Sequence, residues 1–154
     1  MFHNTIYQRP LILTKKCGPF YLHTMSKTVC VPVSIGELLD KITILSIKRV
    51  MVSDLEKVTN VKRELIELMD MGSTFLSQPK VEELYDRLMV VNKNLWDVED
   101  QLRKMELEKK FDEDFILKAR SVYQLNDRRY QIKNEINILL GSDILEVKQH
   151  VDYQ

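Results

Sequence analysis

The chain has 154 residues, 30% of them charged and 44% hydrophobic, and its 23 basic side chains balance its 23 acidic ones. This length suits one domain with one sizeable core, and the neutral total gives no sign of a polyanionic partner. Four glycines and four prolines are too few for a turn-rich β-sandwich or a disordered chain, and no apolar stretch reaches the roughly 18 residues of a membrane span. We therefore expect an all-α domain of long helices that binds neither nucleic acid nor membrane.

Residues 1–26 differ from the rest of the chain. They show neither helical nor strand periodicity, and all of their charged side chains are basic. We predict a poorly ordered N-terminal extension, with a basic arm that contacts phosphates or a membrane surface as the alternative. The two cysteines, Cys17 and Cys30, have no partners at metal-ligand spacing. We expect reduced thiols in the cytoplasm, and neither a metal nor another cofactor.

A single helical domain is predicted for residues 27–154, and it opens with two helices. Residues 28–33 are rich in β-branched side chains and predict a short strand. Capping boxes at 34–37 and 53–56 predict helices over 34–52 and 53–71. The second helix is expected to stop at Gly72, with a loop over 73–79. The apolar stripes of the two helices are Ile35, Leu38, Leu39, Ile42 and Leu45, then Leu55, Val58, Val61, Leu65 and Leu68.

Two longer helices follow, predicted over 79–110 and 112–140. The first carries an unbroken 3-4 spacing typical of a coiled-coil heptad: Val81, Leu84, Leu88, Val91, Leu95, Val98, Leu102 and Met105. The second begins at Asp112 and ends at Gly141. Its apolar line is Val122, Leu125, Ile132, Ile136 and Leu139, and Arg129 interrupts it.

These lengths predict the architecture. The first two helices together match each long helix, so we expect one kinked arm along two antiparallel helices, an elongated antiparallel bundle. Residues 144–151 form a possible second strand, which could pair with residues 28–33 at one end. Because such a narrow bundle leaves an apolar seam exposed, a homodimer is expected.

Polar residues run beside both long seams. On the third helix the line is Tyr85, Met89, Asn92, Trp96, Glu99 and Arg103, and on the fourth it is Ala119, Tyr123, Asn126, Tyr130, Lys133 and Asn137. One interpretation is a hydrogen-bonded layer that fixes helix register; the other is a pocket for a small anionic or sugar-like ligand. A charge on a half-buried face needs a partner, so Glu99 is expected to pair with Arg120 or Lys133.

One further motif concerns catalysis. Glu64 and Glu67, followed by Glu83 and Asp86, match the metal-binding spacing of all-α nucleotide pyrophosphohydrolases. In the heptad frame Glu83 and Asp86 point away from the seam, so we assign no enzyme activity to them.

Three segments carry a resemblance to a known family. They are residues 34–48 (SIGELLDKITILSIK), 91–100 (VNKNLWDVED) and 111–123 (FDEDFILKARSVY) with Asn126 and Asp127 after them. Together they resemble a family of short proteins catalogued only as a domain of unknown function, over about residues 28–150. Similar segments accompany glycosyltransferases of surface-polysaccharide pathways, so the resemblance implies a glycan-related context and no catalytic residues.

Two functions from different classes follow. The preferred one is a non-enzymatic helical interaction or scaffold module that associates with itself or with a protein partner, for which a glycosyltransferase is the candidate. The alternative is a domain that binds or converts a sugar or nucleotide-sugar. Its candidate binding residues are Lys41, Trp96, Glu99, Arg103, Arg120, Asn126, Asp127 and Lys133.

Overall fold

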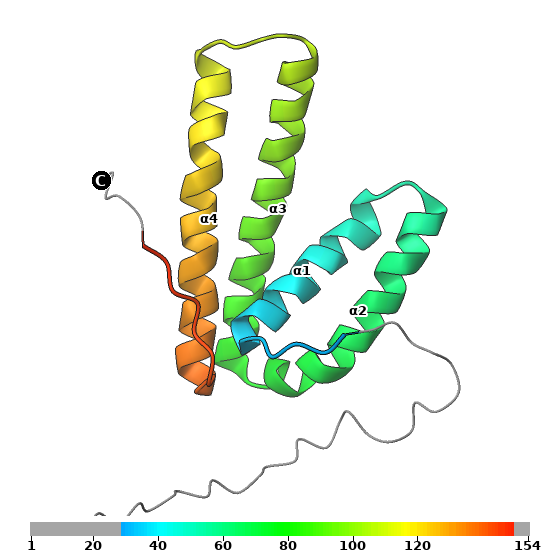
Figure 1. Cartoon of the computed structure of the whole chain (residues 1–154), viewed down its shortest axis with the longest axis vertical. Coiled ribbons are helices and arrows are strands. Elements are labelled where there is room, and N and C mark those ends of the chain that lie inside the picture. Colours follow the sequence, from blue (N-terminus) through cyan, green and yellow to red (C-terminus); the bar gives the residue numbers. More distant parts are fainter. Residues whose placement is uncertain (1–28, 150–154) are drawn as a thin grey trace, which may run out of the picture. The chain divides into compact units, whose positions relative to one another are not determined.

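A computed structural model describes residues 29–149, which contain four α-helices and no strand (Figure 1). The helices are α1 (Ile35–Met51), α2 (Leu55–Leu76), α3 (Pro79–Leu107) and α4 (Glu113–Leu140). The all-α prediction is therefore confirmed. None of these four helices is long and apolar enough to cross a membrane.

Contacts divide the chain into two units, residues 1–31 and residues 32–154. Only residues 29–31 of the first unit are described, so the fold below is that of the second. The predicted N-terminal extension, residues 1–26, lies outside the described residues. The predicted terminal strand pairing is wrong for the described parts, since residues 29–33 and 144–149 take no strand conformation.

Side-chain caps begin three of the helices. Ser34 accepts a hydrogen bond from the Glu37 N–H at 3.1 Å, and Asp112 accepts one from the Phe115 N–H at 3.1 Å. Both predicted helix starts are confirmed. The cap of α2 is Asp54 rather than Ser53, because its carboxylate accepts from two N–H groups of the first turn.

Gly72 does not end α2, which continues to Leu76. The prediction of a helix stop there, followed by a loop over 73–79, is wrong. Gly72 is buried against α1, where an added Cβ would lie 2.4 Å from Ile42 Cδ1. The absent side chain serves close helix packing here, whereas Gly141 ends α4 in the left-handed conformation, with φ 61°.

α1 and α2 form an antiparallel hairpin rather than one kinked arm (Figure 1). Val52 and Asp54 are both extended, which reverses the chain between the helices. The stripe of α1 is confirmed in its central positions, with Leu39 and Ile42 fully buried. Leu55, predicted to face inward, is 83% exposed because it begins α2 at the outer end of this turn.

α3 and α4 form the second antiparallel hairpin and the main core. The seam of α3 is confirmed: Val81, Leu84, Leu88, Val91, Leu95 and Met105 are all buried, and Val98 and Leu102 are half-buried. On α4, Ile132 and Ile136 are buried as predicted, but Leu139 is 41% exposed, so its predicted inward orientation is wrong. The half-buried Leu140 packs against the core instead.

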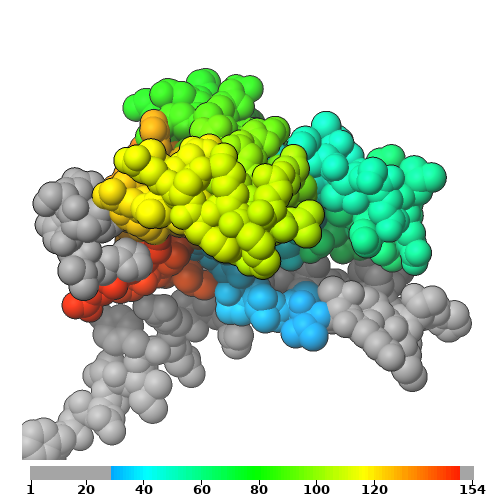
Figure 2. All heavy atoms as spheres, turned by 90° about the horizontal axis from the view of Figure 1, so that it is seen from above, coloured from blue at the N-terminus to red at the C-terminus, as the bar shows by residue number. Residues whose placement is uncertain are grey.

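α1 crosses this hairpin near one end of it. Gly36 and Asp40, in its first turns, contact α4, and Thr43 contacts α3. Beyond the crossing, α3 has only one buried residue after Leu95, and α4 has none before Ile132. We call residues 96–128 the distal hairpin. Figure 2 shows its yellow end nearest the viewer, with no described element over it.

The two glycines at helix contacts should respond differently to alanine. In Gly36→Ala the new Cβ would lie 2.5 Å from the Lys133 carbonyl oxygen, a backbone atom that cannot rotate away. We expect a loss of about 1–3 kcal/mol in unfolding free energy, because α1 and α4 must separate. In Gly72→Ala the clash is with the end of the flexible Ile42 side chain, and alanine gains about 1 kcal/mol of helix propensity.

Urea unfolding of both variants measures the difference. Gly72→Ala should stay within about 1 kcal/mol of the wild type, since the two effects oppose each other. Equal losses in the two variants would contradict the close backbone approach of α1 to α4.

Candidate functional site

A carboxylate is buried where α1, α3 and α4 meet. Asp40 on α1 is 1% exposed, one residue after the core side chain of Leu39. Arg129 on α4 donates from Nε to both Asp40 oxygens, at 2.9 and 3.1 Å, and its Nη2 also donates to Asp40 Oδ2. The two charges thus form a two-nitrogen contact, the geometry in which arginine binds carboxylate most strongly.

α3 completes this group through Asn92. Its amide nitrogen donates to Asp40 Oδ1 at 2.8 Å and to Thr43 Oγ1 at 2.7 Å. The Thr43 hydroxyl in turn donates to the Asp40 backbone carbonyl at 2.7 Å. We call Asp40, Thr43, Asn92 and Arg129 the ionic junction. Each of its members has a hydrogen-bond partner, so the burial of the charge is compensated on all sides.

A second charged group lies one turn further along α4. The ammonium of Lys133, with a side chain only 10% exposed, lies 2.8 Å from Glu37 Oε2 on α1 and 2.6 Å from Glu146 Oε2. The contact with Glu146 is an ion pair rather than an aligned hydrogen bond. Burial acts to lower the pKa of Lys133, but the two carboxylates outweigh it and raise that pKa above its usual 10.5.

Glu146 belongs to a segment without helix, residues 141–149, that lies along α4. Lys148 Nζ from this segment lies 3.0 Å from Asp127 Oδ1 and 5.4 Å from the ring centre of Tyr130. The Tyr130 hydroxyl donates to the Glu146 carbonyl at 3.3 Å. The chain's own C-terminal segment therefore occupies Asp127 and Lys133, two predicted binding residues, and contacts the backbone of a third, Asn126.

The eight predicted binding residues do not converge. Lys133 reaches the charged group beside the ionic junction, while Lys41 pairs with Glu64 of α2 at 2.6 Å, on another face of α1. Asn126 donates to the Val122 carbonyl of its own helix. Arg120 is exposed and lines a groove that Asp127 also lines. Their roles in binding stay predictions.

The predicted partner of Glu99 is wrong. Glu99 accepts from Arg103 one turn later on the same helix, at 2.7 Å, rather than from Arg120 or Lys133. The reason is that this part of α3 lies beyond the crossing of α1, where both side chains are largely exposed and a local pair suffices. Trp96 lies at the start of this region, and its indole nitrogen is buried with no hydrogen-bond partner among the described residues.

The predicted polar layer is buried only in the half that lies beside α1. Asn92, Lys133 and Asn137 are buried, and the Asn137 side chain accepts from the Gly36 N–H at 2.7 Å. Among residues 29–149, no group of three or more histidine, cysteine, aspartate or glutamate side chains could hold a metal ion. The geometry therefore favours the interpretation that this half of the layer fixes the register of the helices.

Sequence reasoning missed Asp40 as the centre of the junction. The available signal was Arg129, a charged residue at a seam position of α4, since a buried arginine requires a carboxylate partner. Nothing in the local pattern, however, selected Asp40 among the 23 acidic residues of the chain.

Comparisons with known proteins add one match. A family model described as a family of unknown function, DUF6165, matches residues 29–152. No curated protein and no solved structure matches the chain.

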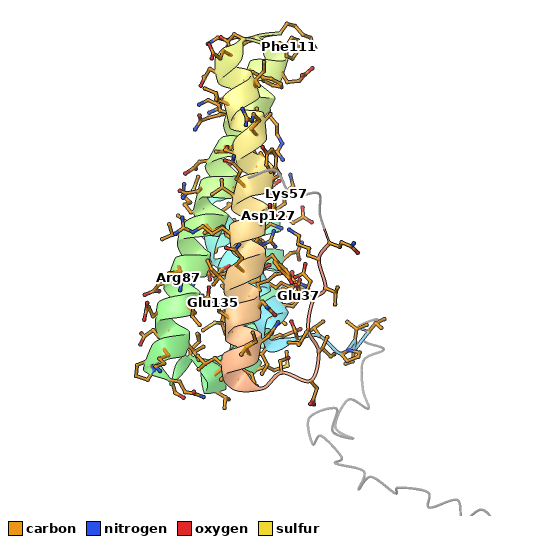
Figure 3. All side chains as sticks on the ribbon, turned by 90° about the vertical axis from the view of Figure 1, so that its left-hand side faces the viewer. Glu37, Lys57, Arg87, Phe111, Asp127 and Glu135 are labelled. Atoms are coloured by element: carbon orange, nitrogen blue, oxygen red, sulfur yellow. The ribbon has the colours of Figure 1, made fainter. Side chains whose placement is uncertain are left out.

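Breaking the ionic junction on one side should be costly. Arg129→Met leaves the Asp40 charge buried without its cation, and we expect a loss of about 3–5 kcal/mol in unfolding free energy. The control is Arg87→Met, which breaks the exposed pair with Glu135 (3.0 Å; Figure 3) and should cost less than about 1 kcal/mol. The double variant Asp40→Leu/Arg129→Met should be more stable than Arg129→Met alone. If the double variant were as unstable as Arg129→Met, the buried charge of Asp40 would not be the cause of the loss in stability.

The raised pKa of Lys133 predicts a loss of stability at alkaline pH. The folded state binds this proton more tightly than the unfolded state, so the contribution is complete below about pH 10 and disappears as pH rises through the folded-state pKa. The difference in unfolding free energy between the wild type and Lys133→Met should thus be constant at neutral pH and shrink above about pH 10.5.

Two comparisons isolate this effect. Burial also raises the pKa of Tyr85, against a hydrogen bond with Ser46 that lowers it. Because Tyr85 is present in both the wild type and Lys133→Met, its contribution cancels in the difference between their unfolding free energies. Lys62→Met, at an exposed position of α2, should show no such pH-dependent difference. A difference for Lys133→Met that stays constant to the alkaline limit would contradict the assignment.

Proposed function

The chain belongs to the DUF6165 family of unknown function, and we propose that it is a non-enzymatic helical interaction module that self-associates through the distal hairpin. The observation that carries this proposal is that, among residues 29–149, no third helix lies over the distal hairpin. Its inner residues Val98, Leu102, Val122 and Leu125 are only half-buried. Two hairpins of this kind together supply the four helices that bury such a seam completely.

Exposed apolar side chains at the end of the hairpin support the same interpretation. Leu107 is 84% exposed, and Phe111, Ile116 and Leu117 are each more than half exposed (Phe111 is labelled in Figure 3). We call these four the end group. Single exposed apolar residues are common, but a group of four at the end of an uncovered hairpin is typical of an interaction site.

Charge favours a second copy of the chain as the occupant. Residues 96–128 carry seven basic and nine acidic side chains, so two copies are nearly neutral toward each other. Along α3 and its C-cap the charges alternate in sign: Asp97 and Asp100 come first, Arg103 and Lys104 follow, and Glu106 and Glu108 come after them. Both signs are therefore available to pair across a two-fold interface between two copies.

The proposal places this module in the cytoplasm, on the basis of the expected reduced thiols. A glycosyltransferase as a further partner rests only on the resemblance described above. The alternative, a ligand site formed by the predicted binding residues, has less support because those residues point to different parts of the surface.

Measuring the mass in solution tests the proposal. Sedimentation equilibrium of the full chain should give twice the 18.2 kDa chain mass. Leu107→Glu/Ile116→Glu should give the single mass with unchanged helix content, because both positions are exposed and charge there opposes association.

Ile66→Glu is the matched control, since Ile66 is 71% exposed on α2, outside the distal hairpin. It should remain dimeric. A wild-type chain that is monomeric at every concentration, or a control that dissociates as readily as the end-group variant, would overturn self-association through the distal hairpin.

A further inference from the structure

A groove that is mainly polar in its larger part follows the α3–α4 hairpin on the side opposite to α1. It consists of two adjoining depressions, of about 620 and 540 Å³, that share Gln124 and Arg128. Arg87 on α3 and Arg120 and Gln131 on α4 line the larger one. We call this larger depression the arginine groove. Its volume lies within the range of small-molecule sites, about 300–1,000 Å³.

Positive charge in the arginine groove is not compensated. Arg120 and Arg128 are exposed, and neither forms an ion pair with a described residue. Asp127 is the one acidic residue among those that line the arginine groove, and Lys148 from the C-terminal segment holds it at 3.0 Å. Arg87 is held by Glu135 across the hairpin at 3.0 Å (Figure 3). Two guanidinium groups thus remain available to a ligand.

The spacing of these groups suits an extended anion. Arg120, Gln124 and Arg128 follow one another at i, i+4 and i+8 on α4, so the backbone positions of the two arginines lie about 12 Å apart along the helix axis. Their long side chains can reach toward one ligand between them. Gln124 between them and Gln131 beyond them have no hydrogen-bond partner among the described residues and can donate to ligand oxygens. Arginine forks match carboxylate and phosphate groups in particular.

The lining of the groove excludes a docked amphipathic helix as its occupant. Ile132 is the apolar residue of the arginine groove, and it is 1% exposed, so it offers almost no surface to bury. A docked helix needs an apolar stripe, whereas a small polar ligand needs convergent donors. We propose that the arginine groove binds a small molecule with two or more anionic groups, phosphate or carboxylate, one at each of Arg120 and Arg128.

Calorimetric titration of the full chain tests this proposal with two probes, inorganic tripolyphosphate and citrate. At least one probe should bind saturably, and the probe that binds more tightly distinguishes phosphate from carboxylate. Arg120→Gln and Arg128→Gln should each raise the Kd by about tenfold or more, the usual effect of losing a charged hydrogen bond.

Arg63→Gln provides the control for net charge, since Arg63 is exposed on α2 and has no ion pair among the described residues. It should leave the Kd within about twofold, a difference below the energy of one weak hydrogen bond. The absence of binding by both probes would overturn the proposal, as would equal weakening by Arg63→Gln, which would indicate attraction to charge in general. Arg128 belongs to the distal hairpin but neither to the end group nor to the inner apolar residues of the hairpin. Arg128→Gln should therefore keep the wild-type mass, so that this inference and the proposed self-association fail separately.

Discussion

The pairing of Asp40 with Arg129 is the interaction on which the rest of the helix arrangement depends. A carboxylate that is 1% exposed is tolerated only where a cation and further donors reach it, and Arg129 and Asn92 meet that need at one place on the hairpin. Apolar contacts alone would allow α1 to slide along the α3–α4 seam, since leucine, isoleucine and valine pack in several registers. The ionic junction restricts α1 to the position in which three polar side chains are satisfied together.

That position has consequences at both ends of α1. Toward its start, Gly36 is brought against the Lys133 carbonyl, and Glu37 reaches the Lys133 ammonium. The same ammonium holds Glu146, so the C-terminal segment is attached to α4 by a charge that is nearly buried. Toward its end, α1 leaves the α3–α4 hairpin and continues into the turn to α2, so within the described part of the chain the distal hairpin has two helices. The proposed interaction site is therefore a direct result of where α1 is held.

The two sides of the α3–α4 hairpin consequently offer different surfaces. The side that binds α1 is closed by α1 itself near the junction. The opposite side carries Arg120 and Arg128 without ion partners among the described residues, which suits a small anion, and further along it presents the half-buried Val98 and Leu125. The proposed self-association and the proposed anion site would rest on different chemistry, burial of apolar area in one case and charge-assisted hydrogen bonds in the other.

Local patterns were enough to predict the helices, because caps and apolar periodicity act over a few residues. Ser34, Asp112 and Gly141 were identified correctly, as was the α3 seam from Val81 to Met105. The predictions for Gly72 and Glu99 were wrong because the packing of the helices decides both: a local rule predicted a helix stop at Gly72, and Glu99 was expected to pair with another helix. Gly72 is needed because Ile42 approaches it, and Glu99 pairs with Arg103 because no other helix among residues 29–149 covers it. The sequence by itself determined which segments are helical and which of their faces are apolar, whereas the choice of Asp40 as the partner of Arg129 belongs to the tertiary structure, since residues 89 positions apart meet only after three helices have packed.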